Sequence, residues 1–374
     1  MKNKKVFILA TINSFVGIPL VKEVHDVFQT KGETCAIQNT FNNFSNFLEN
    51  STDQFTIKNY QSGREFNNQT LFQKIIKYLK LSCFLIWCIL KNRIKRNEII
   101  IYSTDIYTIY LSYLFKSKHI KIIYHQFEML EIELLNRLDS FLLSRISKGF
   151  GRIDLVIFPE TNRMGYFKNI LESYNDDQFF ILPNTNNNNN NNNRVGGVKN
   201  KIKVTHIGAV GVNHNISNYL DAIILLPSDE YEFWFVGLLD DDVLQLIESK
   251  KASNIVLTGQ IPHEDLKEVY STTDIGVILY KDISLNHRFC APNKLYEYWS
   301  YGIPVLGDKL PGLDAVFIHK DLGSLVDMSI SEDISYTLKE MQYLKEETSL
   351  RIDKIFKSTY RLDLYIDGLI NKIN

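Results

Sequence analysis

Residues 288–306 read RFCAPNKLYEYWSYGIPVL, a sequence that predicts a helix followed directly by a strand. Pro292 is favourable as a first helical residue, because the backbone amide hydrogen that it lacks is not needed there. Residues 302–304 then end the helix, and residues 305–306 continue as a short apolar strand. A helix followed at once by a buried strand is half of a β-α-β unit, which predicts a parallel sheet.

The same alternation of helix and strand runs along the rest of the chain. Short segments rich in Ile, Val and Tyr alternate with longer segments of helical period from residue 5 to 180, and again after residue 204. The predicted strands are residues 6–12, 33–38, 98–103, 120–124, 155–158 and 179–182, then 204–207, 232–236, 255–257, 275–279 and 304–306. Because these strands are apolar on both faces, helices should cover both sides of each sheet. The sequence therefore predicts an α/β protein with two doubly wound parallel sheets.

Length and composition limit the possible classes of protein. A chain of 374 residues favours two domains. Its 42 basic and 43 acidic residues balance, so the overall charge gives no reason to expect a nucleic-acid partner. Hydrophobic residues at 45% and charged residues at 23% exclude global disorder and a purely fibrous protein. The four cysteines show neither C-x-x-C nor zinc spacing, which favours a reducing cytoplasm.

Two segments decide what to expect at a membrane. The amino-terminal MKNKKVFILATI begins like a signal peptide, but Thr11 and Asn13 interrupt its apolar stretch, which predicts a buried strand. The longest apolar run, residues 81–90, is half the ~20 residues that a spanning helix needs. Residues 71–96 combine helical spacing with seven cations, as either a core helix or an interfacial helix on anionic lipid would. We expect a cytoplasmic protein, with peripheral contact at the inner membrane face as an open alternative.

Eight consecutive asparagines, residues 186–193, divide the two halves of the chain. Such a tract cannot form a core, so it is either an extended hinge or a neutral expansion in a tolerant loop. The predicted domains are an N-terminal lobe at residues 1–184, an Asn-rich linker at 185–199, a C-terminal lobe at 200–348, and a helical segment at 349–374 that packs across the lobes. Two doubly wound lobes are expected to bind ligands in a cleft at the carboxyl ends of their strands.

The helix predicted to begin at Pro292 carries the clearest binding candidates. Its N-terminus favours anions, because unpaired N–H groups and the positive end of the helix dipole meet there. Lys294 would add positive charge toward a diphosphate, and Glu297 could accept hydrogen bonds from ribose hydroxyls. The alternative is a solvated Lys–Glu pair, worth only ~0.2–0.5 kcal/mol.

Residues 292–305, PNKLYEYWSYGIPV, resemble the nucleotide-sugar motif of the GT-B-fold, family-4-like retaining glycosyltransferases. The version P-x-K-L-x-E-Y is that of bacterial polysaccharide enzymes. Residues 182–184, 204–208, 235–237 and 257–262 are similar to further family segments and follow in the family's order. The resemblance implies two Rossmann-like lobes around a cleft, with the acceptor in the first lobe and the nucleotide sugar in the second. The residues it implies for donor binding are Gly208, Gly259, Arg288, Asn293, Lys294, Leu295 and Glu297.

Two strand ends supply candidates in the N-terminal lobe. The segment IYHQFE resembles a strand-end segment of related enzymes, which makes His125 and Glu128 candidate catalytic groups that hold the acceptor or the reacting sugar. The alternative for each is an ordinary loop residue with satisfied hydrogen bonds. The segment FPETNR ends a strand and starts a helix, which Glu160 or Thr161 could cap. Glu160 and Arg163 are the candidates for acceptor binding.

Two positions depart from the family pattern. Phe289 stands where many members have a carboxylate near the transferred sugar, and the loop 208–215 lacks their Arg and Lys. A diphosphate leaving group needs its negative charge compensated by a metal or by protein donors. No D-x-D pair has a credible metal context, since the one at residues 240–242 opens a helix, where acidic residues act as caps. We therefore expect Lys294, Arg288 and the helix amides to replace the missing cations.

Together these features predict a metal-independent hexosyltransferase that retains the anomeric configuration. It would move a sugar from a UDP- or GDP-linked donor to a glycan or lipid-linked acceptor in surface polysaccharide synthesis, with no cofactor and no nucleic acid. Two alternatives stay open. A nucleotide-sugar epimerase would need a carboxylate dyad, and a non-catalytic GT-B scaffold is favoured by Phe289 and the cation-free loop.

Overall fold

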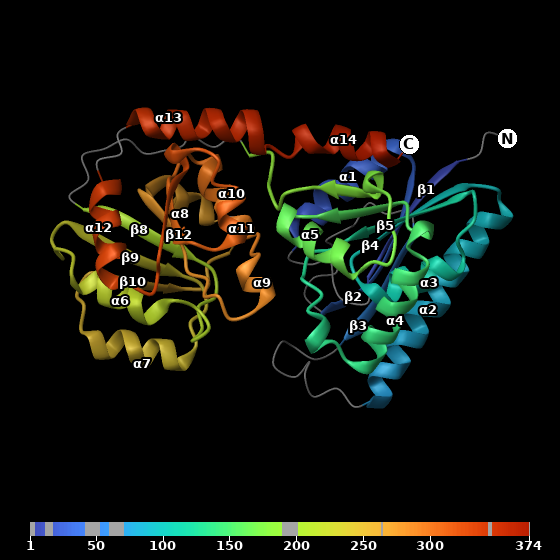
Figure 1. The fold of residues 1–374 in the computed structure, drawn as a ribbon, viewed down its shortest axis with the longest axis horizontal. Helices are drawn as coiled ribbons and strands as arrows, with labels where there is room; N and C mark the ends of the chain where they lie inside the picture. The colour runs from blue at the N-terminus through green and yellow to red at the C-terminus, as the bar shows by residue number, and fades with distance from the viewer. Residues whose placement is uncertain are drawn as a thin grey trace. The chain divides into compact units, whose positions relative to one another are not determined.

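The chain divides into two compact units, each built on a parallel sheet (Figure 1). The computed structural model describes residues 4–11, 18–41, 53–59, 71–188, 201–262, 265–342 and 346–373. The first unit comprises Met1–Pro159, Arg163–Leu182 and Ile366–Asn374, and the second comprises Glu160–Asn162 and Pro183–Tyr365. Most of the predicted linker, residues 189–199, lies outside the described residues.

The sheet of the first unit has seven strands in the order β3-β2-β1-β4-β5-β6-β7, all parallel. The strands are β1 (Lys5–Ala10), β2 (Glu33–Phe41), β3 (Asp53–Asn59), β4 (Glu98–Ser103), β5 (Ile120–His125), β6 (Leu155–Phe158) and β7 (Phe179–Ile181). The longer helices are α1 (Pro19–Lys31), α2 (Leu71–Ile94), α3 (Ile106–Leu114), α4 (Arg137–Lys148), α5 (Thr161–Ile170) and α14 (Asp363–Ile373). The doubly wound prediction is confirmed. Strand β3 was missed, because this edge strand alternates polar and apolar residues and has no apolar run.

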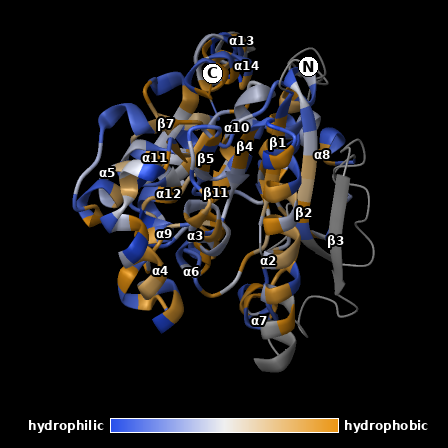
Figure 2. Ribbon diagram, turned by 90° about the vertical axis from the view of Figure 1, so that its right-hand side faces the viewer, coloured by the Kyte–Doolittle hydropathy of each residue, from blue (hydrophilic) through white to orange (hydrophobic). Residues whose placement is uncertain are grey.

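The core of the first unit follows from the strand composition. Central strands β1 and β4 are buried on both faces from their second residue onward, and Figure 2 shows their hydrophobic residues together with those of β5. Helix α2 adds a buried stripe at helical spacing, formed by Leu81, Leu85, Cys88 and Ile89. Removal of this apolar surface from water stabilises the unit by ~25 cal/mol per Å².

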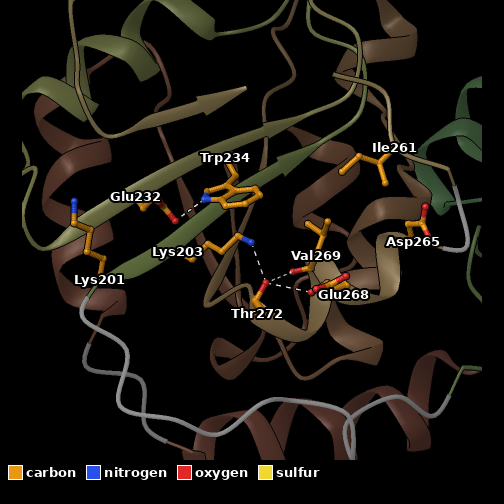
Figure 3. A pocket seen from close by; sticks show the side chains of 9 residues that line it. All are labelled: Lys201, Lys203, Glu232, Trp234, Ile261, Asp265, Glu268, Val269 and Thr272. Carbon is orange, nitrogen blue, oxygen red and sulfur yellow. Dashed lines mark hydrogen bonds between the residues drawn. The ribbon is translucent and has the colours of Figure 1, made fainter. Parts of the chain in front are cut away.

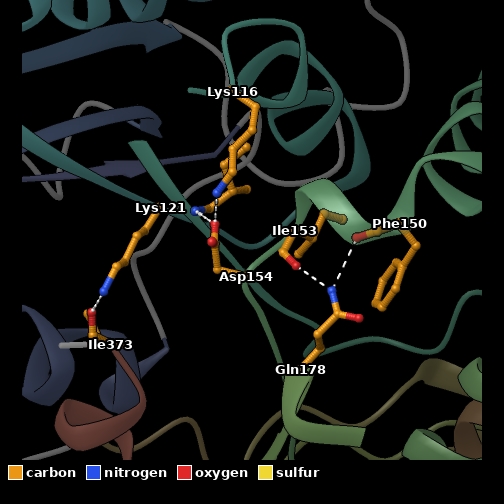
Figure 4. Close-up of polar contacts among 8 residues, drawn as sticks. Lys116, Lys121, Phe150, Ile153, Asp154, Gln178 and Ile373 are labelled. Atoms are coloured by element: carbon orange, nitrogen blue, oxygen red, sulfur yellow. Dashed lines mark hydrogen bonds and ion pairs between the residues drawn. The ribbon is translucent and has the colours of Figure 1, made fainter. Parts of the chain in front are cut away.

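The end of the chain completes the first unit. In helix α14 the Nζ atom of Lys372 donates to the backbone oxygen of Asp177 over 2.9 Å. Lys121, on β5, donates to the backbone oxygen of Ile373 over 2.7 Å (Figure 4). Helix α13 (Glu346–Ile355) belongs to the second unit, so the predicted segment 349–374 is divided between the two units.

The sheet of the second unit has six parallel strands in the order β10-β9-β8-β11-β12-β13. The strands are β8 (Ile202–Ile207), β9 (Tyr231–Val236), β10 (Ile255–Gly259), β11 (Ile275–Ile278), β12 (Val305–Asp308) and β13 (Gly323–Val326). The helices are α6 (Ile216–Ile224), α7 (Asp241–Lys250), α8 (Leu266–Thr272), α9 (Leu285–Arg288), α10 (Asn293–Ser300), α11 (Pro311–Asp314), α12 (Ser331–Met341) and α13. One hydrophobic cluster joins the sheet to α6, α7 and α12, and another joins it to α8, α10 and α13. The edge strand β13 was not predicted, because its sequence GSLV is short and half polar.

Candidate functional site

Three glycines stand at the carboxyl ends of adjacent strands in the second unit. Gly208, Gly237 and Gly259 follow or end β8, β9 and β10, with φ angles of 145°, 143° and 67°. At these angles a side chain is strained, and a Cβ atom added at Gly237 would overlap the backbone of Gly208. The amide of Gly237 donates to the oxygen of Gly259 over 2.9 Å. The strand ends therefore present closely packed backbone, as ligand sites on doubly wound sheets do.

Helix α10 is fixed firmly beside these strand ends. It begins at Asn293, one residue later than predicted, with Pro292 in the N-cap position. The hydroxyl of Tyr298 donates to the backbone oxygen of Thr205 over 2.8 Å, and the indole of Trp299 donates to that of Leu322 over 2.9 Å. Both aromatic side chains are buried, so they hold the helix against the sheet. The side chain of Leu295, a residue predicted for donor binding, is fully buried in the same cluster.

The carboxylate of Glu297 is held by three donors. The Nζ atom of Lys294 lies 2.7 Å from Glu297 Oε2, and the buried hydroxyl of Tyr270 on α8 donates to the same oxygen. Asn293 Nδ2 approaches the other oxygen, Oε1, at 3.3 Å. The Lys–Glu pair predicted as an alternative does form, but it is not solvated: the two side chains are only 20% and 11% exposed. Because a carboxylate can accept about four hydrogen bonds, Oε1 keeps capacity for a ligand hydroxyl.

Tyr270 is suited to donate a hydrogen bond to Glu297 because its hydroxyl group stays protonated. Burial raises the pKa of Tyr270 well above its ordinary value, and the neighbouring Glu297 carboxylate raises it further. The hydroxyl is therefore a donor at every physiological pH. Sequence reasoning missed Tyr270, since 27 residues separate it from Glu297 and only the packing of α8 against α10 joins them.

The other predicted donor residues surround the same edge of the sheet. Arg288 ends the short helix α9 and is exposed, and it forms no ion pair with any residue that the structure describes. Phe289 follows it and is half-buried. The side chain of Asn215 donates to Asp308 Oδ2 and to the backbone oxygen of Tyr280, each over 2.8 Å. Asn215 thus ties the loop after β8 to the ends of β11 and β12.

In the first unit, His125 ends β5 and is completely buried. Its Nδ1 atom is hydrogen-bonded to the hydroxyl of Tyr102, and its ring stacks on Phe127 with centroids 3.9 Å apart. Within the described part of the chain, its Nε2 atom has no hydrogen-bond partner. Burial lowers the pKa of His125 to about 3, so the imidazole is neutral at pH 7. Glu128, three residues further on, is exposed.

The two predicted acceptor residues are engaged in local structure. The buried carboxylate of Glu160 accepts from the backbone amide of Asn162 over 2.7 Å and from its side chain over 3.0 Å, which caps α5. The predicted capping role of Glu160 is therefore confirmed. The buried guanidinium of Arg163 donates to the backbone oxygen of Phe127. Glu160 belongs to the second unit and Arg163 to the first.

A cavity of about 680 Å³ lies on the α8 side of the second sheet (Figure 3). Lys203 Nζ lies 3.4 Å above the ring centre of Trp234 and donates to Thr272 Oγ1 over 2.9 Å. The indole of Trp234 donates to Glu232 over 2.6 Å. The volume of the cavity suits a small ligand. None of the predicted site residues lines it, however, and these lining groups bond to one another.

Comparison with known proteins gives this arrangement a context. Residues 201–341 match the family model described as glycosyl transferases group 1. No curated protein sequence matches the chain. Solved structures match over nearly the whole length. Anabaena Alr3699/HepE in complex with UDP-glucose is 13% identical, with a TM-score of 0.71 and coverage of 99% of both chains.

Two further structures agree with that match. Sucrose-phosphate synthase from Thermosynechococcus elongatus is 13% identical, with a TM-score of 0.72 and coverage of 99% of this chain and 98% of that one. The lipopolysaccharide outer core galactosyltransferase WaaB is 12% identical, with a TM-score of 0.68 and coverage of 99% of both chains. At this level of identity the likeness shows a shared fold. The chain thus has the GT-B fold, and its residues 201–341 match the family model of group 1 glycosyl transferases.

Proposed function

We propose that the protein is a retaining hexosyltransferase that uses a nucleoside-diphosphate sugar. The observation that carries this proposal is the Glu297 carboxylate, fixed by Tyr270 and Lys294 on the first turns of α10 beside the glycine-lined strand ends. A preorganised acceptor at a helix N-terminus suits a ligand that has a diol next to an anion. The Anabaena relative solved with UDP-glucose makes a UDP-hexose the first donor to test.

In the second unit, Glu297 accepts hydrogen bonds from the ribose hydroxyls. The amides of the first turn of α10 and the exposed Arg288 face the diphosphate, while Gly208 and Gly259 let the backbone approach the nucleotide. Lys294 is bonded to Glu297, so its charge reaches the diphosphate only in part. Retention then proceeds by attack on the same face as the departing phosphate, which itself assists removal of the acceptor proton. This chemistry requires neither a protein base nor a metal.

In the first unit, we assign the acceptor to the strand ends of β5 and β6. The Nε2 atom of His125 is unbonded and its ring is neutral, so it can form a hydrogen bond with a sugar hydroxyl without adding charge. The exposed Glu128 and the structurally engaged Arg163 complete the proposed acceptor side of the first unit. Glu160, which belongs to the second unit, stays a separate candidate for acceptor binding. A glycan or lipid-linked acceptor of surface polysaccharide synthesis, handled in the cytoplasm, fits these polar groups.

The outer face of α2 supports peripheral membrane contact. Trp87 is 48% and Ile94 83% exposed, and Lys91 Nζ lies 4.7 Å above the Trp87 ring centre. No helix in the described ranges is long and apolar enough to cross a membrane. An apolar face with cations attracts anionic headgroups. The chain should sediment with anionic vesicles at low salt and lose this binding in Lys91→Glu/Arg93→Glu.

The control for the vesicle experiment reverses two exposed lysines of the second unit, in Lys320→Glu/Lys339→Glu. This variant has the same net charge as the α2 variant and should sediment like the wild type. Equal loss of vesicle binding in both variants would show that binding depends on the overall charge of the protein and not on α2. If the wild type did not sediment with the vesicles, the proposed membrane contact would be wrong.

Donor turnover tests the proposed reaction. The protein is incubated in EDTA with UDP- and GDP-hexoses and a crude lipid-linked acceptor extract, and nucleoside diphosphate release is measured. We expect release with one donor class, an anomeric configuration equal to that of the donor by NMR, and loss in Glu297→Gln. Nucleotide binding without turnover, even with magnesium or manganese, would instead favour the scaffold alternative, for which Phe289 in place of a carboxylate is the supporting observation.

A further inference from the structure

Three histidines gather at the carboxyl edge of the second sheet, around the loop that contains no Lys or Arg. The ring of His214, in the loop after β8, lies 5.9 Å from that of Tyr280 and 6.4 Å from that of His287 on α9, centroid to centroid. Tyr280 and His287 are 5.5 Å apart. His206, the penultimate residue of β8, is buried beneath this cluster. The rings of His214, Tyr280 and His287, from the loop after β8, the segment just after β11 and α9, thus form one cluster.

The buried member of this cluster has an unmet hydrogen bond. The Nδ1 atom of His206 lies 3.1 Å from the backbone oxygen of Val277, whereas its Nε2 atom has no hydrogen-bond partner among the residues that the structure describes. That Nε2 atom lies 3.7 Å from where a Cβ atom would stand on Gly208. A buried polar atom without a partner is costly, and it points to a group that completes the site on binding. The strand end that carries His206 is the one predicted to meet the donor.

The charges around His214 leave it neutral in the unoccupied site. Burial lowers the pKa of His214, and His287 lowers it further, while the contact with Gly211 and the charge of Asp240 oppose this. Gly211 donates its amide to His214 Nδ1 over 3.1 Å, and the Asp240 carboxylate stands beside Gly211. Arg288 directly follows His287 in α9, and Asp308, which ends β12, accepts a hydrogen bond from the side chain of Asn215 in the loop after β8.

We propose that His214 and His287 bind the donor's diphosphate as a histidine pair that takes up a proton with the ligand, in place of fixed cations in the loop. This inference rests on the proposed function and adds the way in which the site compensates charge. A bound diphosphate carries two negative charges close to the pair, which favours an imidazolium. The charge of Asp240 then also stabilises the protonated His214.

The sign of the resulting pH dependence follows from linkage. The pKa of unliganded His214 lies below the ordinary histidine value of 6.5, and the bound diphosphate raises it. Between the two values the complex holds more protons than the free protein, so affinity rises as pH falls. One coupled proton changes the dissociation constant by at most tenfold per pH unit. Below the pKa of unliganded His214 the dependence disappears.

Calorimetric titration of the full chain tests this inference. The ligands are UDP-glucose and GDP-mannose, which have no phosphate group that titrates near neutral pH. For whichever ligand binds, we expect a dissociation constant about five- to tenfold lower at pH 6.0 than at pH 7.5. The heat should also differ between buffers of unequal ionisation enthalpy, in proportion to about one proton taken up.

Variants locate the proton. His214→Asn and His287→Asn should flatten the pH profile, whereas His319→Asn, at an exposed position in the same unit, should keep the wild-type slope. His214→Lys supplies a fixed cation and should bind the donor at pH 7.5 at least as tightly as the wild type, with little pH dependence. Donor affinity at or above the wild-type level cannot come from a misfolded protein.

The outcomes separate two failures. Tight donor binding with no pH dependence and no proton uptake in the wild type would overturn the histidine pair and leave the proposed function intact. A slope that survives in both His214→Asn and His287→Asn would do the same. Absence of binding by either nucleotide sugar at every pH would instead remove the proposed function on which the inference rests.

Discussion

Replacement of Tyr270 by phenylalanine removes one hydroxyl from the best-defined polar cluster in the molecule. That hydroxyl donates to Glu297 Oε2, which also receives Lys294 Nζ at 2.7 Å. A hydrogen bond to a charged group contributes ~1.5–3 kcal/mol, and since Lys294 stays on the same oxygen we expect the lower end, about 1.5 kcal/mol. For a unit of this size that corresponds to a fall in Tm of roughly 3–6 °C.

The same substitution should also weaken nucleotide binding. Without Tyr270 the Glu297 carboxylate is free to rotate toward Lys294, so its orientation toward a ribose must be fixed on binding. We expect the dissociation constant for the nucleoside diphosphate to rise about three- to tenfold, or ~0.7–1.4 kcal/mol. Calorimetric titration of wild-type and Tyr270→Phe protein measures this directly, well below the Tm of both.

Tyr298→Phe is the matched control. Tyr298 lies in the same core, and its hydroxyl donates over 2.8 Å to the backbone oxygen of Thr205 rather than to Glu297. Its loss should lower stability by about 0.5–1.5 kcal/mol without changing nucleotide affinity. If Tyr270→Phe lost stability but bound nucleotide as well as the wild type, the positioning role would be refuted. Equal weakening in both variants would show a general effect of core damage.

Two further predictions concern the strand ends of the second unit. Gly237→Ala should abolish nucleotide binding or folded expression, because the φ angle of 143° at Gly237 and the nearby backbone of Gly208 exclude a Cβ atom. The control Gly165→Ala, with open space around it in α5, should be tolerated. A fully active Gly237→Ala protein would contradict this packing. Burial lowers the pKa of His206 from its ordinary 6.5 to about 4. Between these pH values the unfolded chain binds a proton at His206 that the folded protein does not bind. The free energy of unfolding therefore falls by roughly 3 kcal/mol as the pH drops from 6.5 towards 4. Urea unfolding at several pH values should show a flatter profile for His206→Asn, and parallel profiles would refute the assignment.

The sequence predicted most of the fold because central strands carry their signal locally. Strand β6 is a continuous apolar run and β4 contains one at residues 99–102, and such runs are buried on both faces. The edge strands β3 and β13 lack such runs, and their pairing depends on neighbours distant in the chain. Helix α10 and the turn that ends it were predictable from residue types and spacing, whereas its nucleotide-sugar motif was identified by resemblance to a known family.

The site was predicted less completely, because its contacts are tertiary. Glu297 was identified, but the interaction that fixes it comes from Tyr270 on another helix. Lys294 was expected to meet a phosphate, and it is bonded to Glu297 instead. The loop 208–215 was taken as lacking a cation, since only the fold brings His214 beside His287. Helix packing and strand-end geometry decide each of these contacts, and neither can be derived from spacing along one sequence.

The central claim is that the second unit binds a nucleoside diphosphate through Glu297. Thermal unfolding in EDTA with UDP, GDP, dTDP, CDP and ADP tests it directly, since a ligand at ~100 times its dissociation constant adds ~2.7 kcal/mol to the native state. We predict a rise in Tm with one nucleotide, most readily UDP, that is lost in Glu297→Gln and kept in Lys339→Gln. No rise with any nucleotide, with or without magnesium or manganese, would contradict the account.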